Sequence, residues 1–118
     1  MISDDHLEIN SETIEKIINF RNERNWSQFH NPKDLAISIS LESAELLECF
    51  QWSGADTEVT SKREAMKEEL SDIFIYSILL ADRLKINLDE VIQAKIAKNA
   101  EKYPVEKSFG KSSKYTEI

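Results

Sequence analysis

The sequence predicts an all-α protein, for two reasons. Only two glycines and two prolines occur among 118 residues, and helix-forming Glu, Lys, Leu, Ala and Ile dominate. Apolar side chains also recur at helical spacing in four successive segments. A chain of this length is expected to form one domain, small enough that oligomerisation could add much of its apolar burial.

Charge and cysteine content limit the classes of function. The formal net charge of −7 argues against a surface that coats nucleic acid, which needs clustered Lys and Arg. Cys49 is the single cysteine, which excludes an intramolecular disulfide and a cysteine-based zinc site. No signal-peptide pattern or membrane-length apolar run is present, so we expect a cytoplasmic protein that binds no membrane.

The N-terminal part predicts a flexible arm over residues 1–10, followed by a first helix. Ser11 can cap this helix, and Ile14, Ile17 and Ile18 follow a helical period. We expect the helix to end near Arg24.

An aromatic segment without helical period follows at residues 25–31. Trp26, Phe29 and His30 crowd this stretch, which ends at Pro32, a residue suited to opening a helix. Two interpretations remain open: the aromatic rings fill the end of a helical bundle, or they form a wall against a flat ligand such as a nucleobase.

Two long helices are expected next. The second helix should run from Pro32 to about Trp52, with Gly54 as its C-terminal cap. The third should run from about Lys62 to Leu84 after a polar connection, in which Thr60 or Ser61 could provide the cap. Its second half is apolar nearly all round, so we expect part of it to face another subunit.

The fourth helix should begin at Leu88 and stop before Pro104. Lys95, Asn99 and Tyr103 share one polar face of it. The Lys- and Ser-rich tail over residues 105–118 reads as flexible. The predicted organisation is therefore a helical domain over residues 11–104 between an arm and a tail.

Two acidic pairs inside apolar helices are the strongest functional signal. Glu42 and Glu45 lie three residues apart, and Asp72 has both Glu68 and Glu69 at helical spacing, a choice that periodicity leaves open. In an antiparallel helical pair these carboxylates converge, and such a cluster is unfavourable without a cation. The donors favour Mg²⁺, with Mn²⁺ as a second choice. The alternative to a metal site is that the two acidic pairs simply form solvent-exposed faces of their helices.

The joint pattern resembles the MazG-like nucleoside triphosphate pyrophosphohydrolases, closest to their dCTP pyrophosphatase branch. The likeness extends over roughly residues 14–118. It rests on Glu42, Glu45, Glu69 and Asp72, and on the segments at 20–30, 50–52, 68–73, 102–104 and 114–117. The resemblance implies a four-helix bundle completed by oligomerisation, as a homodimer or a homotetramer built from two dimers.

The resemblance also implies a reaction and roles for individual residues. The reaction is Mg²⁺-dependent hydrolysis of dCTP or a modified dCTP to the monophosphate and pyrophosphate, as house-cleaning of the nucleotide pool. The implied metal ligands and catalytic residues are Glu42, Glu45, Glu69 and Asp72. The implied substrate contacts are Trp26, Phe29, His30, Trp52, Tyr76, Lys95, Asn99 and Tyr103. The alternative is a non-enzymatic helical module for oligomerisation or partner binding.

Overall fold

The computed structural model describes residues 6–117, and every regular element in that range is helical. The four long helices are α1 (Ser11–Glu23), α2 (Pro32–Glu48), α3 (Arg63–Leu84) and α4 (Leu88–Lys102). The short elements are α5 (Val105–Ser108) and the 3₁₀ turns η1 (Trp26–Phe29), η2 (Thr60–Lys62) and η3 (Tyr115–Glu117). The all-α prediction is confirmed. None of the described helices is long and apolar enough to span a bilayer.

Asparagine side chains begin three of the four long helices. Asn10, Asn31 and Asn87 each accept a hydrogen bond from the backbone N–H three residues later, at 2.9, 2.8 and 3.1 Å. Such caps satisfy backbone donors that have no partner inside the helix. The cap of α1 is therefore Asn10, and the prediction of Ser11 was one residue late.

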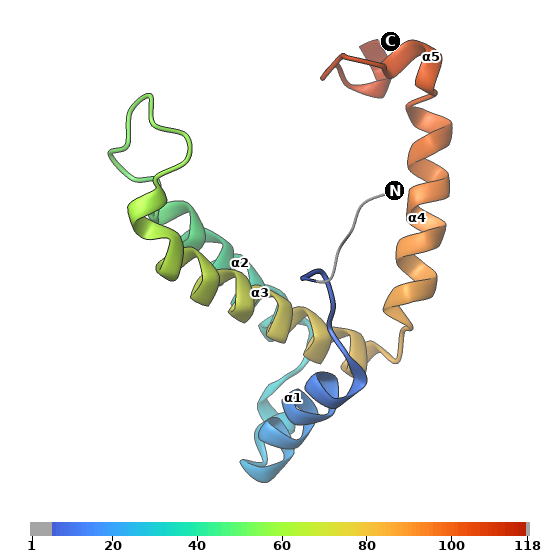
Figure 1. Ribbon diagram of the computed structural model, residues 1–118. Helices are drawn as coiled ribbons and strands as arrows, with labels where there is room; N and C mark the ends of the chain where they lie inside the picture. Colours follow the sequence, from blue (N-terminus) through green and yellow to red (C-terminus); the bar gives the residue numbers. More distant parts are fainter. Residues whose placement is uncertain (1–5, 118) are drawn as a thin grey trace. The chain divides into compact units, whose positions relative to one another are not determined.

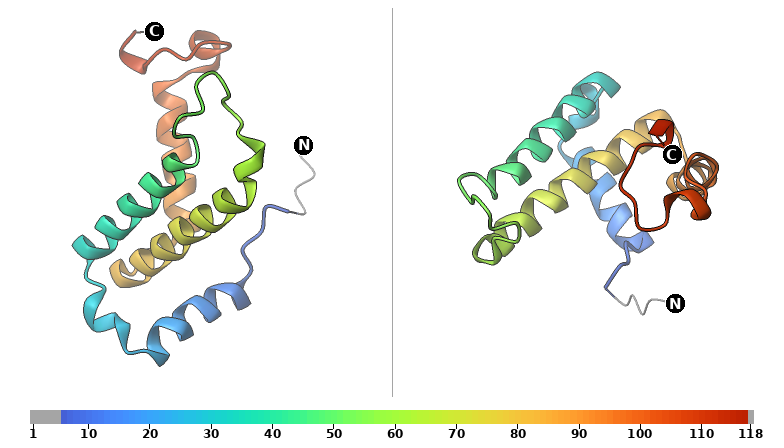
Figure 2. Two further views of the ribbon diagram at one scale, coloured as in Figure 1. Left: turned by 90° about the vertical axis from the view of Figure 1, so that its left-hand side faces the viewer. Right: turned by 90° about the horizontal axis from the view of Figure 1, so that it is seen from above.

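Helices α2 and α3 form an antiparallel pair (Figures 1 and 2). The apolar core of this part of the chain contains Leu35 from α2, and Ile78, Leu79 and Ala81 from α3. Helix α1 packs against α3, so α3 is the element that both other helices share. The carboxylates of α2 and α3 are consequently held on facing helices.

The end of α2 differs from the prediction. The helix ends at Glu48, because the next backbone hydrogen bonds tighten to i→i−3, as from Gln51 N–H to the Glu48 carbonyl. After α2, the first left-handed residue is Trp52, with φ of 64°, and Gly54 is the second, with φ of 60°. At the other end of the connection, η2 precedes α3 and no side chain caps that helix.

The chain divides into two compact units at Lys85. The second unit contains α4, α5 and η3. Within it, the Tyr115 ring meets the Tyr103 ring edge-to-face at 6.0 Å and lies 5.0 Å from the Lys102 ammonium. The tail thus carries short helical elements, while its flexibility stays a prediction. Residues 6–10 of the predicted arm lack regular structure, and residues 1–5 lie outside the described part.

Candidate active site

Three of the four predicted acids meet between α2 and α3. Glu42, Glu69 and Asp72 each offer a carboxylate oxygen within 4.8 Å of the other two. Glu45, one helical turn from Glu42, has an exposed side chain at the edge of this cluster, within hydrogen-bonding reach of the Glu69 carboxyl group. Glu68 is exposed and is not part of the cluster, so the geometry selects Glu69 where periodicity did not.

The cluster is electrostatically unfavourable for four ionised carboxylates. The hydrogen bond with Glu45, partial burial and the nearby Glu42 raise the pKa of Glu69 to about 7. Burial, followed by the hydrogen bond with Glu45, raises the pKa of Glu42. Each of these shifts means that adding a negative charge to the cluster costs free energy.

The donor set fits a hard divalent cation. Glu42 Oε2 and Glu69 Oε2 are buried and have no hydrogen-bond partner among the described residues. No ion pair found within residues 6–117 neutralises any of the four acids. Buried charged oxygens without a partner are costly, and a cation bound by oxygen ligands removes that cost.

A cavity of about 350 Å³ adjoins the cluster through Asp72. Its wall also contains Trp26 and His30 from the η1 segment and Tyr76 from α3. The His30 ring lies edge-to-face with both Trp26 and Tyr76, at centroid distances of 6.4 and 6.5 Å. The structure therefore brings three of the predicted substrate-contacting residues into one mostly apolar cavity.

Two polar groups of this cavity have perturbed pKa values. Burial, together with the positive charge of Arg21, lowers the pKa of His30, so the neutral imidazole is favoured at neutral pH. The buried Nδ1 of His30 has no hydrogen-bond partner within residues 6–117. Burial and the carboxylates of the cluster raise the pKa of Tyr76, which keeps its hydroxyl protonated. Both groups are available to hydrogen-bond a polar ligand.

Part of the cavity wall was not predicted from the sequence. Phe20, Arg21 and Ile17 line the cavity from α1. The helical period of the first helix did include Ile17, but it could not tell which cavity that side chain faces. Phe20 also packs edge-to-face on Trp26 at 5.7 Å.

Five predicted substrate contacts lie elsewhere. The side chains of Phe29 and Trp52 are 61% and 92% exposed, and neither lines the cavity. Lys95 and Asn99 are exposed one turn apart on α4, and Tyr103 forms the C-terminal cap of that helix in the second unit. The roles of these five residues stay predictions.

Comparison with known proteins decides the family. The profile of the MazG-like family matches residues 37–118. This chain belongs to the MazG-like family. The dCTP pyrophosphatase 1 of Mus musculus is 40% identical over 105 residues, and that of Homo sapiens is 38% identical over 104. Each alignment covers 84% of this chain but only 61% of the relative, so the chain spans about three fifths of their length.

A solved structure agrees with this MazG-like assignment. A crystal structure of a pyrophosphatase from Archaeoglobus fulgidus superimposes with a TM-score of 0.73 at 41% sequence identity. The match covers 84% of this chain and 97% of that protein. The predicted family is therefore confirmed.

Proposed function

We propose that this MazG-like chain hydrolyses dCTP, or dCTP with a modified base, to the monophosphate and pyrophosphate in a Mg²⁺-dependent reaction. The observation that carries the proposal is that Asp72 belongs both to the carboxylate cluster and to the wall of the aromatic cavity. A ligand with a flat base and a polyphosphate needs these two surroundings side by side. The names of the relatives, dCTP pyrophosphatase 1, support cytosine as the base.

In this proposal Glu42, Glu69 and Asp72 hold the cation, with Glu45 beside them as the fourth acid. A bound Mg²⁺ supplies positive charge against phosphoryl oxygens and makes water more acidic. The carboxylates accept the proton of the attacking water while it adds to the α-phosphorus. The bond between the α-phosphorus and the oxygen that bridges to the β-phosphorus then breaks, and pyrophosphate leaves.

The cavity residues orient the nucleoside. Trp26 and Tyr76 provide apolar ring surface for a base, and neutral His30 provides a nitrogen that needs a hydrogen-bond partner. Placing the base there directs the phosphates toward Asp72, which lowers the entropic cost of reaching the reactive geometry. Phe29 and Trp52 are further proposed contacts to base and sugar.

The proposed phosphate contacts lie on the second unit. Lys95, Asn99 and Tyr103 supply hydrogen-bond donors, and the Lys95 ammonium offsets charge on the departing pyrophosphate. Their support is the resemblance described above, together with the shared helical face of Lys95 and Asn99 on α4.

We also propose that the protein is a homo-oligomer, either a dimer or a tetramer of two dimers. Large apolar side chains on the α2–α3 pair are exposed, among them Leu41 at 60% and Phe74 at 49%. Exposed apolar surface of this kind is typical of subunit contacts. Light scattering coupled to size-exclusion chromatography measures the state directly, and a monomer at micromolar concentration contradicts this part.

Product identification tests the reaction. The protein is incubated with Mg²⁺ and each deoxynucleoside triphosphate, and the products are separated by anion-exchange chromatography. Monophosphate and pyrophosphate, fastest from dCTP, are the expected products. Diphosphate and orthophosphate would contradict the cleavage position. Absence of turnover with every base would favour the non-enzymatic module instead.

A matched pair of variants tests the acidic site. Glu45→Gln removes one charge from the edge of the cluster and is expected to abolish turnover while circular dichroism stays helical. Glu68→Gln removes a charge from an exposed neighbouring position and should retain wild-type turnover. Equal activity of the two variants would contradict the role proposed for the cluster.

A further inference from the structure

Arg21 is an almost buried cation in the wall of the aromatic cavity. Its side chain is 11% exposed, and its Nη1 donates to Asp82 Oδ2 at 2.7 Å. Its Nε donates to Asn22 Oδ1 at 3.0 Å. The guanidinium group is thereby held at two positions while it borders the cavity that Trp26 and His30 also line.

Packing alone does not account for a charged residue at this place. Taking most of the Arg21 side chain out of water costs desolvation free energy, which its attraction to Asp82, itself 36% exposed, only partly returns. An apolar pair often joins two helices equally well. The guanidinium group has five N–H donors and no acceptor. Residues 6–117 accept two hydrogen bonds from Arg21, which leaves further donors on the same rigid plane.

We propose that Arg21 is a specificity-determining residue that reads the base of the nucleotide as a hydrogen-bond donor, and that Asp82 is its positioning residue. This inference rests on the function proposed above, because it places the base in the cavity between α1 and α3.

The donor pattern of Arg21 predicts which base is preferred. Cytosine presents two adjacent acceptors, the ring nitrogen N3 and the carbonyl oxygen O2, which match two N–H groups of one guanidinium plane. Uracil and thymine carry a hydrogen on N3, so an N–H group of arginine would face another donor there. Arginine cannot give up a proton to resolve that conflict. A site built on Arg21 therefore favours dCTP over dUTP.

Asp72 is the carboxylate of the cavity wall, and the proposed function assigns it to the cation. Asp82, the carboxylate that faces Arg21, is engaged in the ion pair and does not line the cavity. Lys16 and His30 also line the wall, and the unpaired Nδ1 of His30 can complement a second edge of the base. Discrimination by a correct two-bond contact is on the order of tenfold to a hundredfold.

A charge swap separates base reading from simple helix clamping. The double variant Arg21→Asp with Asp82→Arg retains an ion pair between α1 and α3 but moves the cation to a position outside the cavity wall. If the pair only holds the two helices together, the swap recovers both the stability and the base preference that Arg21→Gln loses. If Arg21 reads the base, the swap restores stability and leaves the preference lost.

The experiment measures kcat/KM for dCTP and for dUTP, and thermal unfolding, in four proteins: wild type, Arg21→Gln, the swap and Arg83→Gln. Arg83 is an exposed arginine next to Asp82 and serves as the control. We expect the dCTP-to-dUTP ratio of kcat/KM to fall by about tenfold or more in Arg21→Gln and in the swap. The control should keep the wild-type ratio.

Asp82→Asn tests the positioning role, since it keeps the shape of the side chain and removes its charge. We expect it to raise KM for dCTP and lower the base ratio while kcat stays near wild type. An active wild type with an unchanged ratio in Arg21→Gln, or a swap that recovers the full ratio, overturns the inference alone. A wild type that hydrolyses no nucleotide refutes the proposed function, and the inference falls with it.

Discussion

Titration of Glu69 should control cation binding near neutral pH. With a pKa of about 7, this carboxyl group is about one tenth ionised at pH 6 and about nine tenths ionised at pH 8. A cation that binds the ionised form must displace the proton, so affinity follows the ionised fraction. We therefore expect the nucleotide-free protein to bind Mg²⁺ about tenfold more weakly at pH 6 than at pH 8.

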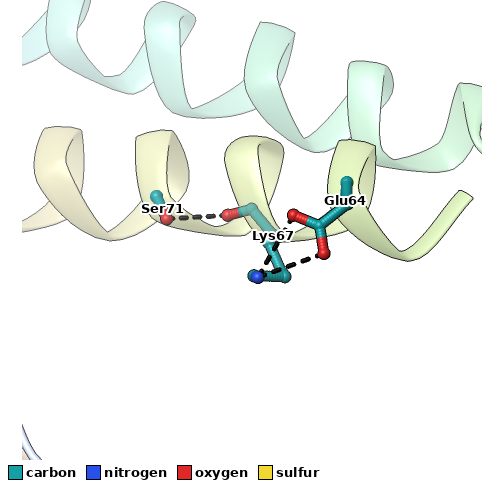
Figure 3. Close-up of polar contacts among 3 residues, drawn as sticks. All are labelled: Glu64, Lys67 and Ser71. Carbon is teal, nitrogen blue, oxygen red and sulfur yellow. Dashed lines mark hydrogen bonds and ion pairs between the residues drawn. The ribbon is translucent and has the colours of Figure 1, made fainter.

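Isothermal titration calorimetry with MgCl₂ between pH 6 and 8 measures this dependence. Glu69→Gln should bind more weakly at pH 8 and lose the pH dependence, because the amide does not titrate. Glu64→Gln is the matched control on the same helix. Glu64 is paired with Lys67, whose Nζ lies 3.2 Å from each of its carboxylate oxygens, while Ser71 Oγ donates to the Lys67 carbonyl (Figure 3).

The same pKa predicts the pH dependence of stability without a cation. The folded-state pKa of Glu69 lies above its ordinary value of 4.5, so the folded protein binds more protons than the unfolded chain between these values. Stability from this group is present below about pH 4.5 and is lost as pH rises through 7. Adding Mg²⁺ at pH 8 should restore it. Equal Mg²⁺ affinity of the wild type at pH 6 and pH 8 would refute this reasoning. The same would follow if Glu69→Gln kept the wild-type dependence of Mg²⁺ affinity on pH.

Two further predictions concern the fold. Leu35→Ala leaves a cavity beside α3 and should lower the free energy of unfolding by about 2–5 kcal/mol in urea denaturation, whereas Leu7→Ala, at an exposed site before α1, should change it little. A similar cost for both would be inconsistent with this core. Lys85 has φ of 58° at the C-terminal cap of α3, so Lys85→Gly should raise stability by up to about 1 kcal/mol, and a loss measured by the same method would contradict the left-handed cap.

Helices were predictable because their signals are local. The expected span of Lys62–Leu84 for the third helix differs by one residue from the observed Arg63–Leu84. The end of the second helix was placed four residues late, because Gln51 and Trp52 suit a helix while the backbone tightens before them. Competition between helical and 3₁₀ hydrogen bonds depends on the following connection, which periodicity does not describe.

The candidate site was predictable only for the carboxylates, whose helical spacing and position on two neighbouring helices can both be read from the sequence. The acids of α2 and α3 meet because these helices pack antiparallel, which brings the turn with Glu42 opposite the turn with Glu69 and Asp72. The cavity wall from α1 was missed, since Phe20 and Arg21 meet Tyr76 of α3 only in the folded chain and no local pattern connects them. Trp52 is exposed, and its aromatic character alone does not indicate what it contacts.

The small apolar core has a consequence for handling the protein. Leu35 is the only large side chain within residues 6–117 that is essentially inaccessible to solvent. In the proposed oligomer, much of the remaining apolar surface is covered only after subunits meet, so folding and association share one equilibrium. For a dimer, each tenfold dilution then removes about 1.4 kcal/mol of stability. The melting temperature and the proposed specific activity should therefore decline together as the protein is diluted.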